Sequence, residues 1–134
     1  MDIKAIIPQR EPIIMIDKIV SHSEVKTITS LVVKNTTLFV EENIFQSSGV
    51  IENIAQSSAA RMGMQTAEEG RKPLLGYIAS IKNLNISRLP LVGETIQTEI
   101  IVTNKINNII VVKAESRVDD TIIANCELKV FIEI

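Results

Sequence analysis

The chain has 134 residues, of which 14 are Lys or Arg and 16 are Asp or Glu, so its formal net charge is −2. This length predicts one domain spanning residues 1–134, and the charge balance lacks the cationic surface that nucleic-acid binding requires. One cysteine, Cys126, excludes an internal disulfide, and one cysteine with one histidine cannot build the usual zinc sites. We therefore expect a cytosolic protein that holds neither a metal nor another cofactor.

The apolar stretches of the sequence are short. The N-terminus has no basic start followed by a long apolar run, and charged residues interrupt every apolar stretch well before the ~20 residues that a membrane helix needs. We therefore expect neither a signal peptide nor a membrane span.

Six segments have the composition or the alternation of β-strands. The last is the clearest, because apolar and polar residues alternate along it with a period of two, as in a half-buried strand. The pair Asp119-Asp120, which precedes it, fits a hairpin turn. Since the last four segments follow one another closely, they predict an antiparallel sheet. The expected strands are Ile13 to Val20, Val25 to Val33, Leu74 to Ser87, Thr95 to Thr103, Ile110 to Val118 and Ile122 to Ile134.

The stretch from Ser47 to Gly63 predicts a helix. Its apolar and small residues recur at helical spacing, Ser47 or Ser48 can cap its N-terminus, and Gly70 lies close beyond its C-terminal end. Between Gly49 and Ala60 it carries one charged residue, Glu52. Because a helix that is apolar or small nearly all round is normally enclosed by other structure, we expect the sheet to wrap around it.

Six antiparallel strands around one central helix define the hot-dog architecture, an α+β fold. A helix with so little polar surface also indicates that a second subunit covers part of it. We therefore expect a dimer whose sheets join edge to edge.

Two segments of the first half resemble the hot-dog 3-hydroxyacyl-acyl carrier protein dehydratases of fatty-acid synthesis. The opening "IPQREPIIMIDKIV" is similar to their Pro-His-Arg, apolar run and Asp-Arg pattern, with Gln9 at the position of the histidine. The helix "GVIENIAQSSA" is similar to their central helix, whose Glu-x-x-Ala-Gln arrangement corresponds to Glu52, Ala55 and Gln56.

A third segment extends the resemblance, which then runs from Ile7 to about Ile96. "GYIASIKNLNISRLPLVGETI" is similar to the following strand of the family, its arginine (Arg88) and its Pro-x-x-Gly-(Asp/Glu) turn, which ends here at Glu94. Three such motifs in order, at suitable spacing, are fairly specific for the fold.

The resemblance implies a site built from two subunits. In that family one subunit supplies a histidine from a Gly-His-Phe-Pro loop before the helix, and the other supplies the helix carboxylate. Here Leu38 stands at about the position of the histidine, and Phe39 corresponds to the phenylalanine. The resemblance thus implies Glu52 as the catalytic carboxylate of a site that lacks its histidine.

The candidate site residues each have an alternative role. Glu52 and the supporting Gln56, one turn later, are the catalytic candidates, although both can instead form structural hydrogen bonds. Arg10, Arg88 and Gly49 are the candidates for binding substrate or carrier protein, although arginines at turns are more often solvated or salt-bridged.

The sequence context of the remaining histidine, methionine and cysteine candidates favours structural roles. His22 lies between two expected strands, in a context typical of a solvated turn. Met62 and Met64 are expected to pack, and Cys126 falls on the apolar face of the last strand, where an inert core thiol is expected.

The sequence therefore predicts a protein that handles acyl thioesters, related to these dehydratases, with acyl carrier protein or its acyl chain as partner. It acts either with Glu52 alone as a homodimer or as one subunit of a heterodimer with a histidine-bearing homologue. Two alternatives remain: a hot-dog thioesterase, which relies on one helix carboxylate and a water, and a dimeric subunit that binds without catalysis.

Overall fold

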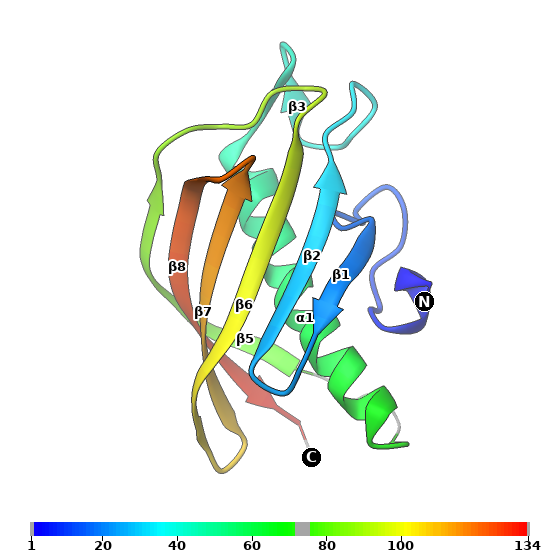
Figure 1. The fold of residues 1–134 in the computed structure, drawn as a ribbon, viewed down its shortest axis with the longest axis vertical. Coiled ribbons are helices and arrows are strands. Elements are labelled where there is room, and N and C mark those ends of the chain that lie inside the picture. The colour runs from blue at the N-terminus through cyan, green and yellow to red at the C-terminus, as the bar shows by residue number, and fades with distance from the viewer. Residues whose placement is uncertain (1, 72–75, 134) are drawn as a thin grey trace.

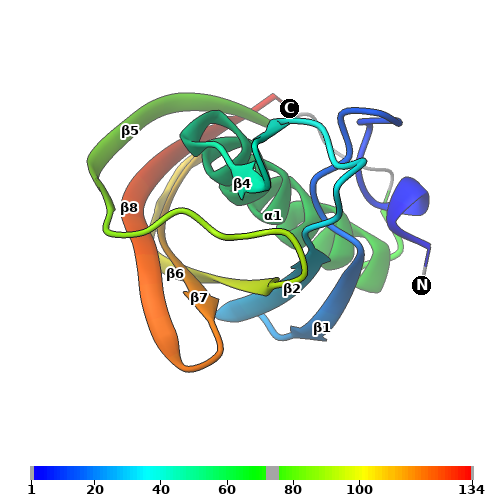
Figure 2. The same ribbon diagram turned by 90° about the horizontal axis from the view of Figure 1, so that it is seen from above.

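The computed structural model of the protein describes residues 2–71 and 76–133. A six-stranded antiparallel sheet curves around one long helix, which lies in its hollow (Figures 1 and 2). The elements are the short helix η1 (Ile3–Ala5), β1 (Lys18–His22), β2 (Lys26–Val32), β3 (Val40–Glu41), β4 (Ile44–Phe45), α1 (Ser47–Glu68), β5 (Gly76–Ile86), β6 (Thr95–Ile106), β7 (Ile109–Val118) and β8 (Thr121–Ile132). The expected hot-dog fold is therefore confirmed.

The sheet has the strand order β1-β2-β6-β7-β8-β5, with every neighbouring pair antiparallel. The strand that directly follows the helix, β5, thus lies at the edge next to β8 rather than beside β6. Leu74 and Leu75, at the start of the strand expected there, and Ile134, at the end of the last expected strand, lie outside the described residues.

The turns explain why the C-terminal strands form hairpins. Asp119 has a φ of 56°, and Asn107, between β6 and β7, has a φ of 55°. Asp and Asn tolerate this left-handed conformation better than most residues. The expected turn at Asp119-Asp120 is therefore confirmed, since Val118 pairs with Thr121 across it.

The first expected strand begins later than predicted. It was expected from Ile13 to Val20, but β1 starts at Lys18. The backbone of Met15 is instead bonded by side chains of α1, so the segment before β1 lies against the helix without sheet pairing.

The helix starts and ends largely as its sequence indicates. Its N-cap is Gln46, which forms no side-chain capping bond, so the prediction of a cap at Ser47 or Ser48 is wrong; Ser47 is the first helical residue. At the other end Gly70 has a φ of 67° and donates to Ala67, while Arg71 donates to Thr66. These two bonds form a Schellman motif that ends the helix.

The main core lies between α1 and the concave face of the sheet. The alternation of β8 places Leu128 and Cys126 inward among buried aliphatic residues. Burial raises the pKa of the Cys126 thiol, which keeps it protonated, in agreement with the expected inert role. A second apolar cluster packs the N-terminal residues Ile3, Ile6 and Ile7 against Ala60 of the helix.

Candidate functional site

Glu52 and Gln56 lie one turn apart on α1 and are hydrogen-bonded. The Gln56 Nε2 amide donates to Glu52 Oε1 over 2.9 Å. Glu52 is half-buried and forms no other hydrogen bond within the described residues. Its second carboxylate oxygen therefore remains available to a ligand or a water.

The orientation of Gln56 is fixed by the segment before β1. Gln56 is fully buried, its Oε1 accepts from the Met15 backbone amide over 2.6 Å, and its Nε2 also donates to the Ile13 carbonyl over 2.8 Å. An amide nitrogen carries two hydrogens. One of these hydrogens bonds to the Ile13 carbonyl, so the other is directed at the Glu52 carboxylate. The Gln56 side chain thus links the N-terminal segment to Glu52, and we call this arrangement the Gln56 clamp.

Two further buried side chains set the rotation of the helix against the sheet. Asn53 donates to the Met15 carbonyl over 2.7 Å and accepts from Thr98 of β6 over 2.6 Å. Ser57 donates to the Asn53 carbonyl, so its oxygen accepts from Thr29 of β2 over 2.7 Å. Because each buried group has a partner, this network stabilises one rotation of α1, with Glu52 beside Gln56.

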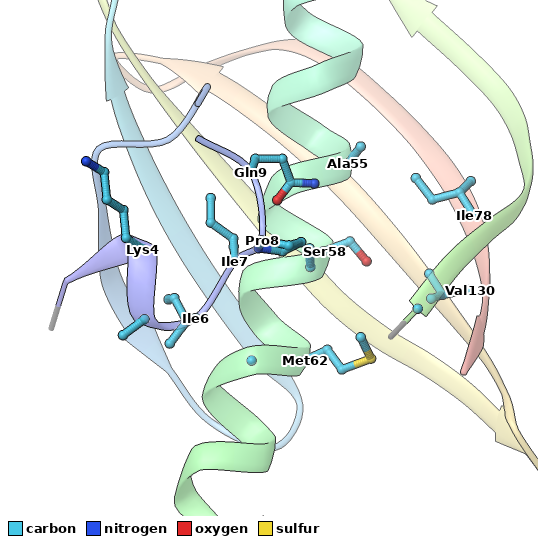
Figure 3. A pocket seen from close by; sticks show the side chains of 14 residues that line it. Lys4, Ile6, Ile7, Pro8, Gln9, Ala55, Ser58, Met62, Ile78 and Val130 are labelled. Atoms are coloured by element: carbon cyan, nitrogen blue, oxygen red, sulfur yellow. The ribbon is translucent and has the colours of Figure 1, made fainter. Parts of the chain in front are cut away.

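An apolar cavity of about 310 Å³ lies along the helix beyond Glu52. Its wall includes Ala55, which is on the same helix face as Glu52 one turn further on. Figure 3 shows Ala55, Ser58 and Met62 of the helix between the N-terminal segment and the strands that carry Ile78 and Val130. A mainly apolar space with a few polar groups is typical of a small-molecule site.

Gln9 contributes a polar group to this cavity (Figure 3). Its Oε1 atom is buried and has no hydrogen-bond partner within the described residues. Since a buried acceptor without a donor is unfavourable, Gln9 is poised to accept a hydrogen bond from a bound hydroxyl or amide. The sequence singled out this position only by its place in the opening motif.

The loop before the helix has no polar counterpart to Glu52 at the position of the missing histidine. Leu38 lies there in a turn and is partly exposed. Phe39 and Phe45 cover the start of the helix at Gly49, where an added Cβ would lie 2.9 Å from Phe39 Cβ and 2.5 Å from Phe45 Cε1. Gly49 therefore allows the Phe45 ring and the Phe39 side chain to approach the helix closely.

His22 is not in the solvated environment expected from the sequence. Its side chain is 2% exposed, its Nδ1 lies 2.7 Å from Thr27 Oγ1, and its Nε2 lies 3.6 Å from Glu68 Oε2. The expectation was wrong because the side chain folds under the last turn of α1. Glu68 is 16 residues beyond Glu52, about 24 Å along a helix, so the His22 of this chain does not lie beside its own Glu52.

The two candidate arginines form hydrogen bonds to residues close to them in the sequence. Arg10 donates to the backbone carbonyls of Ile7, Gln9 and Lys4 and so shapes the N-terminal segment. Arg88 forms two hydrogen bonds to Glu94, at 2.8 and 3.1 Å.

The Arg88–Glu94 pair closes the Pro-x-x-Gly-Glu turn. The Arg88 guanidinium and the Leu91 amide lower the pKa of the Glu94 carboxyl. Gly93, with a φ of 96°, supplies the left-handed residue that the turn needs.

Two features are absent from the described residues. No group of three or more His, Cys, Asp or Glu side chains there is arranged to hold a metal ion. Nor does any helix in residues 2–71 and 76–133 have the length and apolarity to cross a membrane.

Comparisons with known proteins match nearly the full length of the chain. The family model for ApeP-like dehydratases, described as ApeP dehydratase, matches residues 1–133. The 3-hydroxyacyl-[acyl-carrier-protein] dehydratase FabZ of Staphylococcus epidermidis is 30% identical over 130 residues, covering 94% of this chain and 89% of the relative. The FabZ of Listeria welshimeri is 25% identical over 134 residues, covering 94% and 90%.

Solved structures share the fold. The dehydratase heterocomplex ApeI:P of Xenorhabdus doucetiae superposes with a TM-score of 0.91 at 12% identity, covering 100% of this chain and 92% of that one. A hypothetical thioesterase of Streptococcus pneumoniae with coenzyme A gives a TM-score of 0.72 at 9% identity, covering 87% and 84%. At such low identity these likenesses show the hot-dog fold alone.

Proposed function

We propose that this chain, which belongs to the ApeP-like family of dehydratases, supplies the carboxylate half of a site that dehydrates 3-hydroxyacyl chains on an acyl carrier protein. Its FabZ relatives are named as dehydratases of that substrate class. The observation that carries the proposal is the clamp in which Gln56 holds Glu52, because a catalytic acid or base must be positioned before it can transfer a proton efficiently.

Dehydration requires two proton transfers. A base removes a proton from the carbon next to the thioester carbonyl, the electrons form the C=C bond, and the 3-hydroxyl leaves as water after taking up a proton. Glu52, held by Gln56, serves as one of the two groups. In the apolar cavity beyond it, the acyl chain is sheltered from bulk water, and Gln9 Oε1 accepts a hydrogen bond from the hydroxyl or a thioester-arm amide.

The second group comes from a histidine-bearing homologue. Leu38 at the histidine position leaves the loop before the helix without a proton-transfer group there, and the similar structure from Xenorhabdus doucetiae is a dehydratase heterocomplex. The 3-hydroxyacyl-acyl carrier protein dehydratases that this sequence resembles build each site from two subunits. A heterodimer would likewise complete a site with Glu52 on one side and the histidine of the homologue on the other.

The edge strand β5 offers the surface for this pairing. Within the described residues β5 pairs with β8 on one side only, and Tyr77, Ile81 and Leu84 are at least 40% exposed along it. A long, exposed, apolar edge strand promotes aggregation, so its burial against a second subunit is favourable. An obligate interface of this kind buries on the order of 2,000 Å² or more.

The test is an assay of the chain alone, of a histidine-bearing homologue alone and of the two co-expressed. Conversion of 3-hydroxyacyl-carrier protein to the enoyl form is followed by mass spectrometry. In the mixture, Glu52→Gln in this chain should lower the rate by ~10²–10⁴-fold. The matched control Glu41→Gln changes an exposed carboxylate before the helix and should leave the rate unchanged.

Three outcomes would contradict the proposal. Full dehydratase activity of this chain alone would show that no partner histidine is needed. Unchanged activity of the mixture with Glu52→Gln would show that Glu52 has a structural role only. Release of free acyl chain rather than enoyl product would instead identify a thioesterase.

A further inference from the structure

A second cavity of about 310 Å³ lies beneath the C-terminal half of α1, at the end of the molecule where the β1–β2 and β6–β7 hairpins turn (lower part of Figure 1). The helix residues that line it begin at Arg61, nine residues beyond Glu52, about 13.5 Å along a helix. This Arg61 cavity is therefore separate from the surroundings of Glu52.

Arg61 is buried without a counter-ion. The residue is 6% exposed, its Nε atom has no hydrogen-bond partner, and no carboxylate pairs with it in residues 2–71 and 76–133. Burial lowers the pKa of the guanidinium, yet arginine keeps its charge in proteins. A buried charge without a partner costs several kcal/mol, which favours a site that an anion completes.

The charges around the cavity indicate what kind of anion fits. Lys105 and Arg71 add two positive charges to that of Arg61, and Glu24 and Glu69 add two negative charges. The balance leaves one positive charge, which suits a monoanion better than a phosphate. A carboxylate also matches the two parallel N–H donors of a guanidinium.

The uncharged part of the lining contains the polar side chains of Gln65 and Thr66 and an apolar wall. Met62, Val102, Ile110 and Ile132 supply it, and Met62 also lines the cavity near Glu52. A volume of about 310 Å³ is at the small end for ligand pockets.

We propose that the Arg61 cavity binds a small amphiphilic monocarboxylate, with its carboxylate on Arg61 and its apolar part against Met62 and the sheet. This inference does not depend on the dehydratase proposal, because it uses neither Glu52 nor a partner subunit.

The test is titration of the purified chain with octanoate and with two comparison ligands. Octan-1-ol has the same chain length but no charge, and inorganic phosphate is an anion without an apolar part. Octanoate should bind saturably and more tightly than either. Arg61→Met should weaken octanoate binding by about 10- to 150-fold, since a hydrogen bond to a charged group contributes about 1.5–3 kcal/mol. Arg88→Met, which removes a guanidinium paired with Glu94, is the control and should leave octanoate binding unchanged.

A measurement on the unaltered chain covers the case in which Arg61→Met does not fold. The Arg61 Nε–H resonance should shift on addition of octanoate, and that of Arg88 should not. Octanoate binding that is absent, or that leaves the Arg61 resonance in place, would overturn the proposal. Tighter binding of phosphate than of octanoate would overturn the assignment to a monocarboxylate.

Discussion

Replacing Gln56 with methionine should strongly destabilise the fold. Methionine has a similar length but offers neither the acceptor for the Met15 amide nor the donors for Ile13 and Glu52. Met15 is 1% exposed, so its N–H group loses its partner in a site closed to bulk solvent, which costs about 1–3 kcal/mol.

The other two bonds of Gln56 add less. Ile13 is exposed, and its carbonyl can bind water instead, while Glu52 is only half-buried. We therefore expect a total loss of about 2–4 kcal/mol in the free energy of unfolding. For a domain of this size that corresponds to a fall in Tm of roughly 10 °C.

Equilibrium urea unfolding, followed by circular dichroism, measures this loss. The protomer concentration must be the same for all variants, because association contributes to apparent stability. Gln65→Met is the matched control on the same helix, since Gln65 bonds only to the exposed Glu69 within the described residues; it should change stability by less than about 0.5 kcal/mol. A loss below that limit for Gln56→Met would refute the clamp as a structural element.

Three further predictions follow from particular contacts. Gly63→Ala places a Cβ 2.1 Å from the Ile6 carbonyl oxygen, so the N-terminal segment should detach from α1 and be cleaved faster by protease than in the parent chain. Arg88 and the Leu91 amide lower the pKa of the Glu94 carboxyl from its ordinary value of 4.5, so their bonds to the ionised carboxylate stabilise the fold above that pH, and this stabilisation is lost as the pH falls. Glu94→Gln should therefore destabilise the fold at pH 7 and make no difference to its stability in strong acid. The double variant Ile81→Lys, Leu84→Lys charges the β5 edge and should convert a dimer to a monomer in light scattering, whereas a monomeric parent chain would contradict the edge-to-edge interface.

The sequence predicted where the strands lie along the chain better than which strands pair in the sheet. The alternation along β7 and β8 and the turn at Asp119-Asp120 are local signals, and the structure confirms both. The pairing of β5 with β8 is a contact between distant segments, and periodicity carries no information about it. The short strands β3 and β4 were missed because two residues are too few to show a period.

The polar side of the helix was the least predictable part of the site. Asn53 and Ser57 on this side of the helix are both buried. Their partners on the sheet, such as Thr29 and Thr98, occupy inward positions that resemble any β-branched core position. Only the register of helix and sheet, which is set by tertiary packing, brings these polar groups together.

This buried polar network links the fold to the position of Glu52. An apolar helix in an apolar groove can rotate at small cost, since such contacts are not directional, whereas a rotation of α1 would break the bonds of Asn53 to Met15 and Thr98 together. Glu52 precedes Asn53 by one residue, about 100° around the helix axis. The bonds that hold Asn53 toward the sheet therefore hold Glu52 to the side, where Gln56 donates to it and its free oxygen is left for a substrate or a partner subunit.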